Sequence, residues 1–243
     1  MRRAAALVVA LLVLVLAAAC TPEGPKFKSS DVTGATFGRD FALTDHNGKP
    51  RNLADYRGKA VAVFFGYTQC PDVCPTTLAA LAETMKALGP DAERVQVLFI
   101  TIDPDRDTQA LLAQYVPAFD PRFVGLYGDA AATERVAKEF KIIYQKQPGP
   151  TPGTYTMDHS AGVFVFDPQG RLRLYVSHGQ SPDIYVHDLR ALLGSGAAAG
   201  CSVVASERMA RSPNVALGAG TPPPVAACAR TGAPCAALMP PPP

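Results

Sequence analysis

Two short apolar runs with a helical pattern between them constrain the fold of this chain more than any other feature. Residues 59–65 and 95–102 are rich in Val, Phe and Ile, and apolar runs of this length are typical of strands buried on both faces. Between the runs, apolar residues recur at spacings of three and four, which places them on one face of a helix: Leu78, Leu81, Met85 and Leu88. This helix is predicted over 76–88, and Gly89-Pro90 ends it. Strand, helix and strand in this order predict an α/β fold.

The flanking sequence adds a hairpin at each end of this core. Asn47-Gly48 stands between the short runs 41–43 and 50–53, and Asn-Gly in that setting is a strong hairpin signal. The same patterns predict further elements: strands over 123–127, 161–166 and 171–176, a hairpin turn at 167–170, and helices over 108–115, 130–140 and 182–193. The expected fold class is an α/β sandwich with an N-terminal β-hairpin and a C-terminal hairpin plus helix.

The N-terminus is typical of an export signal. Met1-Arg2-Arg3 precedes an uncharged apolar run over 4–19, and Cys20 follows small residues. The run is shorter than the ~20 apolar residues that span a membrane. The residues before Cys20 resemble a bacterial lipobox, although Ala17 takes the place usual for Leu. We predict an exported lipoprotein whose Cys20 carries lipid, with an uncleaved anchor and simple secretion as the alternatives.

These patterns divide the chain into four segments. Residues 1–20 are the predicted signal peptide with its lipobox, and the polar stretch 21–35 is a tether between membrane and domain. The folded domain is expected over 36–193. Residues 194–243 are rich in Gly, Ala and Pro, and such a composition predicts a disordered tail.

Charge and cysteine content narrow the class of protein. Lys and Arg total 23 against 21 Asp and Glu, a net charge of +2, which does not supply the dense basic face that nucleic acid requires. Of six cysteines, two lie close together in the predicted core. Since exported proteins meet an oxidising environment, these two thiols will form a disulfide unless a metal or a reductant keeps them apart.

The most informative stretch follows the first apolar run. Residues 64–75 read Phe-Phe-Gly-Tyr-Thr-Gln-Cys-Pro-Asp-Val-Cys-Pro. Pro75 suits the first turn of a helix because its missing N–H would have no partner there, which puts Cys74 at or near the cap. The unpaired N–H groups and the dipole of a helix N-terminus favour thiolates, which attack disulfides and bind metals. Cys70 and Cys74 are thus prepared for either chemistry, and a structural disulfide is the plain alternative.

Two thiolates need a third ligand to complete a typical metal site, and the chain has four histidines. His46 lies in a predicted hairpin turn and His187 in the last helix, positions typical of surface residues. His178 follows a strand and is ambiguous. His159 lies between a Pro/Gly-rich loop and a predicted strand, and its case is the strongest of the four. Asp158 could accept a proton from the His159 ring and orient it.

Three motifs, taken in this order, resemble the Sco/SenC family of copper proteins: Cys70-Pro71-Asp72-Val73-Cys74-Pro75, Ile102-Asp103-Pro104-Asp105-Arg106-Asp107-Thr108, and Asp158-His159-Ser160. The resemblance extends from about Thr36 to Leu193. It implies a thioredoxin-like fold, membrane attachment, and a role in assembling the dinuclear copper centre of cytochrome c oxidase subunit II. It also implies metal binding by Cys70, Cys74 and His159.

The chemistry of these donors agrees with that implication. Two soft thiolates and one imidazole suit copper, whereas structural zinc takes four protein ligands. Copper, as Cu(I) or Cu(II) or both, is therefore the expected ion. The expected partners are cytochrome c oxidase subunit II and other periplasmic copper carriers. The protein would work tethered to a membrane, facing the periplasm or the cell exterior.

The main alternative is a thiol-disulfide reductase that keeps the copper-binding cysteines of the target reduced. Cys70 and Cys74 would then be an attacking and a resolving thiol. Such an enzyme needs no histidine ligand, so the effect of losing His159 separates the two functions. A peroxidase is disfavoured because Thr68 lies only two residues before Cys70 and the Pro of the peroxiredoxin pattern is missing. No receiver or DNA-binding segment supports a copper sensor, and a copper store is the remaining alternative.

Alternating acidic residues mark the turn after the second apolar run. Asp103, Asp105 and Asp107 are spaced like the opening of a calcium loop, but Thr108 takes the place of the required Gly and Gln114 that of the terminal Glu. An EF-hand is therefore excluded. We expect a strand-to-helix turn with Asp107 as the helix cap. A partner-docking or redox-tuning surface is the alternative.

Overall fold

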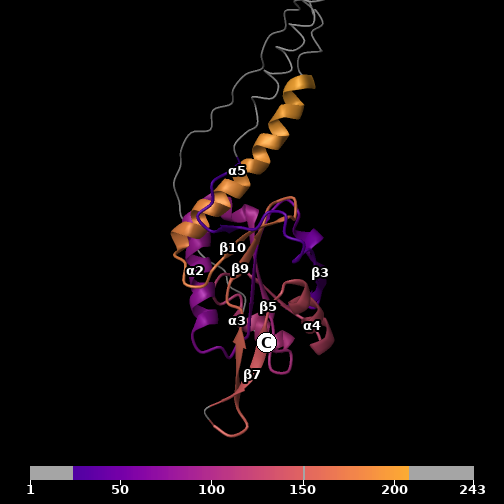
Figure 1. The fold of residues 1–243 in the computed structure, drawn as a ribbon, viewed down its shortest axis with the longest axis vertical. Helices are drawn as coiled ribbons and strands as arrows, with labels where there is room; N and C mark the ends of the chain where they lie inside the picture. Colours follow the sequence, from indigo (N-terminus) through magenta and orange to yellow (C-terminus); the bar gives the residue numbers. More distant parts are fainter. Residues whose placement is uncertain (1–23, 150, 208–243) are drawn as a thin grey trace, which may run out of the picture.

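The computed structural model describes residues 24–149 and 151–207 (Figure 1). The predicted signal peptide, 1–20, and residues 208–243 of the predicted tail lie outside these ranges. Within them, the main sheet has the strand order β1-β10-β9-β4-β5-β6-β2-β3. Its strands are β1 (Ser30–Asp31), β2 (Ala42–Asp45), β3 (Pro50–Asn52), β4 (Ala60–Gly66), β5 (Val95–Thr101), β6 (Val124–Tyr127), β9 (Val163–Phe166) and β10 (Leu172–Val176).

The apolar runs form the centre of this sheet. β4 is buried along its whole length and pairs in parallel with β5, with Val63 opposite Leu98. β6 pairs in parallel with β5, and β9 lies antiparallel on the other side of β4. Because the carboxyl ends of parallel strands meet at one edge of a sheet, the loops after β4 and β5 lie side by side there. The predicted α/β class is confirmed.

Helices cover both faces of the sheet. They are η1 (Leu53–Tyr56), α2 (Val73–Leu88), η2 (Gly89–Arg94), α3 (Gln109–Tyr115), α4 (Ala130–Glu139) and α5 (Pro182–Glu207). Figure 1 shows α2 and the start of α5 on one side of the sheet and α4 on the other. Leu78, Leu81 and Met85 of α2 are buried, as their spacing predicts. Among the helices in the described ranges, none has both the length and the apolar character that crossing a bilayer requires.

Both predicted hairpins are present. β2 pairs antiparallel with β3, and β9 with β10. The turn residues Gly48 and Gly170 have φ angles of 80° and 73°, a region that glycine enters without the steric cost that a Cβ would add. The turn signals in the sequence therefore identified the correct residues.

A third hairpin lies outside the main sheet, and the sequence pattern does not predict it. β7 (Tyr144–Pro148) and β8 (Tyr155–His159) pair antiparallel, with Tyr144 opposite His159. Figure 1 shows this hairpin projecting at the bottom of the molecule. β7 is polar and mostly exposed, so no apolar alternation marks it as a strand. His159 is thus the last residue of a strand rather than part of a loop before the next one.

The folded unit also begins before Thr36, the predicted boundary. β1 pairs antiparallel with β10, at an edge of the sheet. The backbone N–H groups of Lys28 and Ser29 each donate to the buried carboxylate of Asp188, at 2.8 Å. Part of the segment 21–35, predicted to be a tether, therefore packs on the domain. A strand of two polar residues leaves no periodic pattern that sequence could reveal.

At the other end of the domain, α5 continues past Leu193, where the sequence predicts the helix to end. Leu189, Leu192 and Leu193 are buried, and Gly194 is exposed. The helix nevertheless runs to Glu207, through residues that the sequence assigns to a disordered tail. The alanines at 197–199 favour a helix because alanine has the highest helix propensity, whereas the neighbouring glycines oppose it.

Candidate metal centre

Cys70 lies in the loop between β4 and α2, and Cys74 lies at the start of α2. The N-cap residue of α2 is Asp72, so Cys74 and Pro75 both lie in the first helical turn. The Cys74 N–H, one of the donors that a helix N-terminus leaves unpaired, donates to Cys70 Sγ at 3.3 Å. Cys74 is fully buried and Cys70 partly exposed. The helix start thus supports a thiolate at Cys70, the thiol that faces solvent.

The two cysteines have opposite acidities. A hydrogen bond from the Cys74 thiol, together with the backbone N–H groups of Cys74 and Asp72, lowers the pKa of Cys70 to about 3, although burial opposes the shift. The same hydrogen bond, together with burial, raises the pKa of Cys74 well above its ordinary range. In the reduced, metal-free protein, Cys70 is therefore the thiolate and Cys74 the thiol.

This difference predicts how the reduced, metal-free protein reacts with iodoacetamide. Between about pH 5 and about pH 7 an ordinary thiol gains thiolate, and hence alkylation rate, by about 100-fold. Cys70 is ionised over this whole range, so its alkylation rate should stay nearly constant, while Cys74 should react slowly throughout. Mass spectrometry of the two modified sites, with an unstructured cysteine peptide as the reference, measures both rates. A Cys70 rate that rises in parallel with the reference would contradict this assignment.

His159 presents one ring nitrogen to the cysteines. Its Nδ1 lies 2.9 Å from the carbonyl oxygen of Ser160, and since a carbonyl can only accept, the neutral ring carries its proton on Nδ1. Nε2 keeps its lone pair and lies 3.6 Å from Cys74 Sγ. The expectation that Asp158 orients the ring is wrong, because the Asp158 side chain is exposed and the backbone of Ser160 accepts the Nδ1 proton.

The three predicted ligands converge in the structure. One ligand atom each from Cys70, Cys74 and His159 lie within 4.8 Å of one another, and no other group of three or more His, Cys, Asp or Glu in the described ranges is arranged to hold a metal ion. A hollow of about 430 Å³ opens onto Cys70 and His159, with Pro71 and Ala161 in its lining. The cluster is therefore reachable from solvent. Two thiolates with one imidazole suit copper better than magnesium or calcium, which prefer oxygen ligands.

Two aromatic side chains lie close to the imidazole of His159. The ring of Tyr67 lies edge-on to His159 with a centroid separation of 6.0 Å, and the ring of Phe64 lies at 6.3 Å. The Tyr67 hydroxyl accepts the N–H of Met157, two residues before His159 in β8. The loop after β4 thus contacts both the histidine and the strand that carries it.

Gly66 makes room for Cys74 at the end of β4. A Cβ at this position would lie 2.8 Å from Cys74 Sγ and 2.8 Å from a ring atom of Phe99. We expect Gly66→Ala to displace Cys74, to destabilise the domain by about 1–3 kcal/mol through overpacking, and to weaken metal binding. Denaturant unfolding and copper titration measure the two effects. Gly58→Ala is a control for adding a methyl group at a glycine, because a Cβ there meets no atom within 4 Å and only the backbone at φ 90° is strained. Unchanged copper binding in Gly66→Ala would contradict the proposed packing.

The acidic turn after β5 supports the cysteine loop. Thr108, not Asp107, caps α3, accepting the Leu111 N–H with its hydroxyl. Asp107 is buried and accepts the backbone N–H and the hydroxyl of Thr68 as well as the hydroxyl of Thr101. Burial raises the pKa of its carboxyl, against these hydrogen bonds. The prediction of Asp107 as a helix cap is therefore wrong, because its side chain turns inward to the loop that leads to Cys70.

The other three histidines lie outside the cluster. His46 Nδ1 accepts the Gly125 N–H at 3.0 Å, and burial lowers the pKa of its ring. His178 contacts Thr77 through Nδ1, and His187 contacts Asp188. Each therefore has a structural contact of its own. His159 was the strongest candidate on sequence, and it is the histidine that the fold brings to the cysteines.

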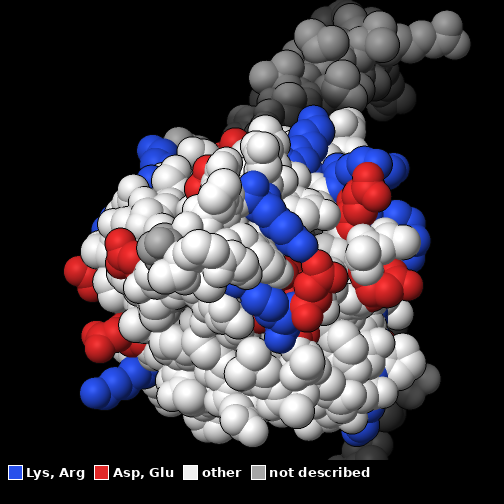
Figure 2. Space-filling model, turned by 90° about the horizontal axis from the view of Figure 1, so that it is seen from below, with Lys and Arg blue, Asp and Glu red and all other residues white. Residues whose placement is uncertain are grey.

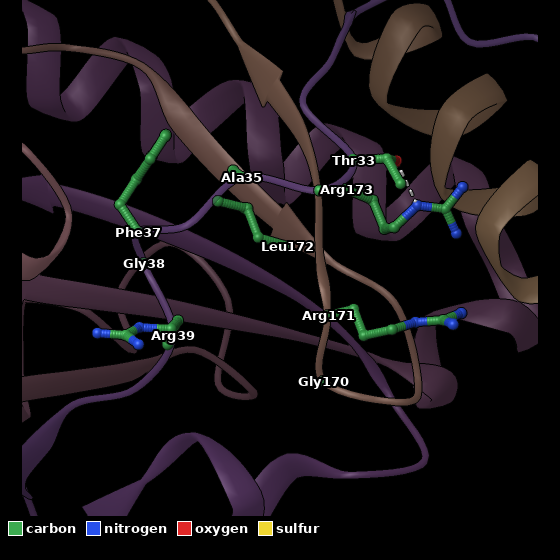
Figure 3. Close-up of a pocket in the computed structure, with 10 residues that line it drawn as sticks. Thr33, Ala35, Phe37, Gly38, Arg39, Gly170, Arg171, Leu172 and Arg173 are labelled. Carbon is green, nitrogen blue, oxygen red and sulfur yellow. Dashed lines mark hydrogen bonds between the residues drawn. The ribbon is translucent and has the colours of Figure 1, made fainter.

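A larger hollow, of about 580 Å³, lies away from the cysteines, between residues 33–39 and the start of β10. Figure 3 shows Arg39 pointing to one side of it and Arg171 and Arg173 to the other. Arg39 pairs with Glu139, and both Arg171 and Arg173 pair with Asp167. Because these guanidinium groups diverge and already have carboxylate partners, this hollow lacks the converging charges of an anion site.

Charges on the face seen from below, at the end where the β7–β8 hairpin projects, are mixed. Figure 2 shows Lys and Arg side chains beside Asp and Glu side chains on this face, with uncharged surface around them. Lys146 of β7 forms an ion pair with Asp105 of the acidic turn at 2.6 Å, so positive and negative side chains are also neighbours within this part of the structure.

Comparisons with known proteins point to one family. The family model SCO1/SenC matches residues 30–194. Among solved structures, the chain is similar to Bradyrhizobium japonicum ScoI with copper bound, at 40% identity and a TM-score of 0.60 over 65% of this chain and 100% of that one. It is also similar to apo Sco1 from Thermus thermophilus, at 41% identity and a TM-score of 0.62 over 70% of this chain and 98% of that one. These likenesses confirm the predicted thioredoxin-like fold.

A curated relative extends the likeness to mitochondria. The chain is 37% identical to the mitochondrial protein SCO2 homolog of Mus musculus over 153 residues, which are 62% of this chain and 60% of that protein. The chain thus spans about 60% of the length of this relative.

Proposed function

Because this chain belongs to the SCO1/SenC family, we propose that it is a copper metallochaperone that helps to assemble the dinuclear copper centre of cytochrome c oxidase subunit II. The observation that carries this proposal is the convergence of two cysteine sulfurs and one imidazole nitrogen within 4.8 Å. Cys70, Cys74 and His159 are the proposed copper ligands. The open side of the cluster, toward the hollow of about 430 Å³, is the proposed route for the ion.

The acidities of the two cysteines suggest the order of copper binding. Cu(I) meets the Cys70 thiolate first, because this sulfur is partly exposed and already ionised. Cys74 then exchanges its proton for the metal, so binding releases one proton to solvent. His159 adds Nε2, whose lone pair is free while Nδ1 is held by Ser160. Since three donors meet at this site among the residues that the structure describes, a thiolate of the target can bind the ion before these ligands leave.

The reductase alternative rests on the same pair of cysteines. The Cys70 thiolate would attack a disulfide of the target, forming a mixed disulfide and releasing one target thiolate. Cys74, once deprotonated, would attack Cys70 Sγ, closing the Cys70–Cys74 disulfide and releasing the second target thiolate. The low pKa of Cys70 favours this chemistry. It gives His159 no ligand role, however, and a histidine ring directed at the thiols favours the metal.

Copper transfer to a purified target tests the proposed function. Two equivalents of Cu(I)-loaded protein are mixed with the reduced, copper-free soluble domain of cytochrome c oxidase subunit II, a one-electron oxidant is added, and the absorption of the dinuclear centre of that domain is followed. We expect this absorption to appear as copper leaves the chaperone. In a parallel sample, the reduced, copper-free protein is mixed with the disulfide form of the domain. If target thiols form in the second sample and copper does not move in the first, the reductase replaces the chaperone.

We also propose that the protein is exported and held at a membrane through Cys20, facing the periplasm or the cell exterior, where other copper carriers would load it. The sequence pattern of 1–20 supports this location. Mass spectrometry of the membrane fraction is expected to find a mature chain that starts at Cys20 and carries lipid. An intact N-terminus from Met1, or unlipidated protein in the soluble fraction, would contradict the lipoprotein assignment. Cys20→Ser, which keeps the apolar run, is the matched control.

A further inference from the structure

The three proposed ligands come from two segments that the main sheet does not join directly. Cys70 lies in the loop after β4, with Cys74 in the first turn of α2, whereas His159 ends the separate β7–β8 hairpin. The distance between the sulfurs and the imidazole therefore depends on side chains that connect the hairpin to the rest of the domain. The turn after β5 lies between the two segments and supplies one such side chain, Arg106.

Arg106 contacts both ligand-bearing segments at once. Its Nη1 donates to the backbone carbonyl of Tyr155, in β8, at 2.8 Å, and to the Gln69 side chain, next to Cys70, at 3.1 Å. Its guanidinium carbon lies 3.6 Å from the centroid of the Tyr155 ring and 5.6 Å from that of the Tyr67 ring. The side chain is 18% exposed. One mostly buried cation thus touches the cysteine loop and the histidine strand.

A buried carboxylate holds Arg106 in this position. Asp103, whose side chain is 1% exposed, accepts from Arg106 Nε through Oδ2. Its other oxygen, Oδ1, accepts the Tyr155 hydroxyl at 2.7 Å. Asp103 therefore binds both the Arg106 guanidinium and the hydroxyl of Tyr155, whose ring lies against that guanidinium. The flat guanidinium group, with several N–H donors in fixed directions, is specific to arginine.

We propose that Arg106 is a positioning residue for the metal centre, which sets the separation of His159 from Cys70 and Cys74. The inference rests on the proposed copper function. Tyr155, Met157 and His159 occupy every second position of β8, so their side chains point to the same side of the strand. Arg106 holds this strand at Tyr155, and Tyr67 holds it at the Met157 N–H. With the far end of β8 released, His159 loses its fixed approach to the thiols.

This role predicts an unequal effect on the two oxidation states of copper. Two thiolates alone can hold Cu(I) in a linear arrangement, so Cu(I) depends little on the position of His159. Cu(II) prefers tetragonal sites with nitrogen or oxygen donors and depends on the imidazole. A displaced hairpin should therefore weaken Cu(II) binding and leave Cu(I) binding nearly unchanged. A residue that only stabilised the fold would affect both ions alike.

The experiment compares Arg106→Lys with Lys146→Ala in the full chain. Arg106→Lys keeps the charge but loses the planar fork. Lys146 is the matched control because its Nζ lies 4.6 Å from the centroid of the same Tyr155 ring, and its ion pair with Asp105 links the hairpin to the same turn. Unlike Arg106, half of its side chain is exposed. We expect Arg106→Lys to shift the Cu(II) thiolate absorption and to weaken Cu(II) binding by roughly 10–100-fold, the usual cost of removing a group that orients a ligand. Lys146→Ala should resemble the parent.

The outcomes separate this inference from the proposed function. If the parent binds no copper, the proposed function fails. If the parent binds copper, two results for Arg106→Lys overturn the inference on Arg106. One is a Cu(II) absorption and Cu(II) affinity equal to those of the parent, and the other is an equal loss of affinity for Cu(I) and Cu(II). Should Arg106→Lys not fold, Tyr155→Phe serves in its place, because it removes only the hydroxyl that binds Asp103. A smaller shift of the Cu(II) absorption is then expected, and an unchanged spectrum overturns the inference.

Discussion

Replacing His159 by Ala is expected to abolish Cu(II) binding while leaving Cu(I) bound. The substitution removes the nitrogen donor that lies 3.6 Å from Cys74 Sγ and leaves two sulfurs, which suit Cu(I) but not Cu(II). Removing a group that merely orients a ligand costs roughly 10–100-fold in metal affinity, so losing the ligand itself should cost at least that much. The Cu(II) thiolate absorption of the purified variant, followed during a copper titration, measures the loss.

His178→Ala is the matched control for this substitution. His178 is exposed and contacts Thr77 on the first turns of α2, so its loss removes an imidazole near the site without removing a proposed ligand. In cells, His159→Ala should lack assembled cytochrome c oxidase, and its thiols should still exchange with a disulfide reagent in vitro. Full oxidase activity in this variant, or an unchanged Cu(II) absorption, would contradict the role of His159 and favour the reductase.

Oxidising Cys70 and Cys74 to a disulfide is expected to eliminate copper binding at the site altogether. A disulfide removes both thiolates in one step, and one imidazole cannot hold the ion alone. Their sulfurs are among the ligand atoms that lie within 4.8 Å of one another, so a small movement of the partly exposed Cys70 suffices to form the bond. Copper bound per chain, measured by metal analysis after dialysis, should fall from one to none on oxidation and return on reduction.

The full chain has cysteines outside the site, at 20, 201, 228 and 235, and these require a control. The double variant Cys70→Ser/Cys74→Ser retains all of them, so copper that it binds is not bound at the site. After this amount is subtracted, the reduced parent should hold one copper and the oxidised parent none. An oxidised protein that keeps its copper above this background would show that the two thiolates are not the ligands.

Much of the site was predictable because it depends on local sequence. A buried apolar strand, a loop with two cysteines and a proline in the first turn of a helix fix Cys70 and Cys74 at a helix N-terminus, and α2 has that form. The central strands followed from their apolar runs in the same way. Metal binding by these residues stays a prediction, although the fold brings them together with His159.

What could not be predicted depends on contacts between distant segments. β7 is polar and exposed, so its pairing with β8 is decided by tertiary contacts such as that of Arg106 with Tyr155. The inward turn of Asp107 requires Thr68 from the neighbouring loop. In both cases the partner lies far along the chain, and one sequence contains no signal that links the two. The contact between the His159 ring and the backbone carbonyl of Ser160 could not be predicted for another reason, because every residue has a carbonyl and the sequence does not mark the one that is used.

X-ray absorption at the copper edge identifies the atoms that hold the bound ion. The reduced full chain, His159→Ala and Cys70→Ser/Cys74→Ser are each loaded with one equivalent of Cu(I), the oxidation state that the histidine variant is expected to retain. The proposed site predicts two sulfur neighbours and one imidazole nitrogen in the parent, loss of the imidazole signal in His159→Ala, and loss of both sulfurs in the double variant. A copper environment without sulfur in the parent, or an imidazole signal that persists in His159→Ala, would contradict it.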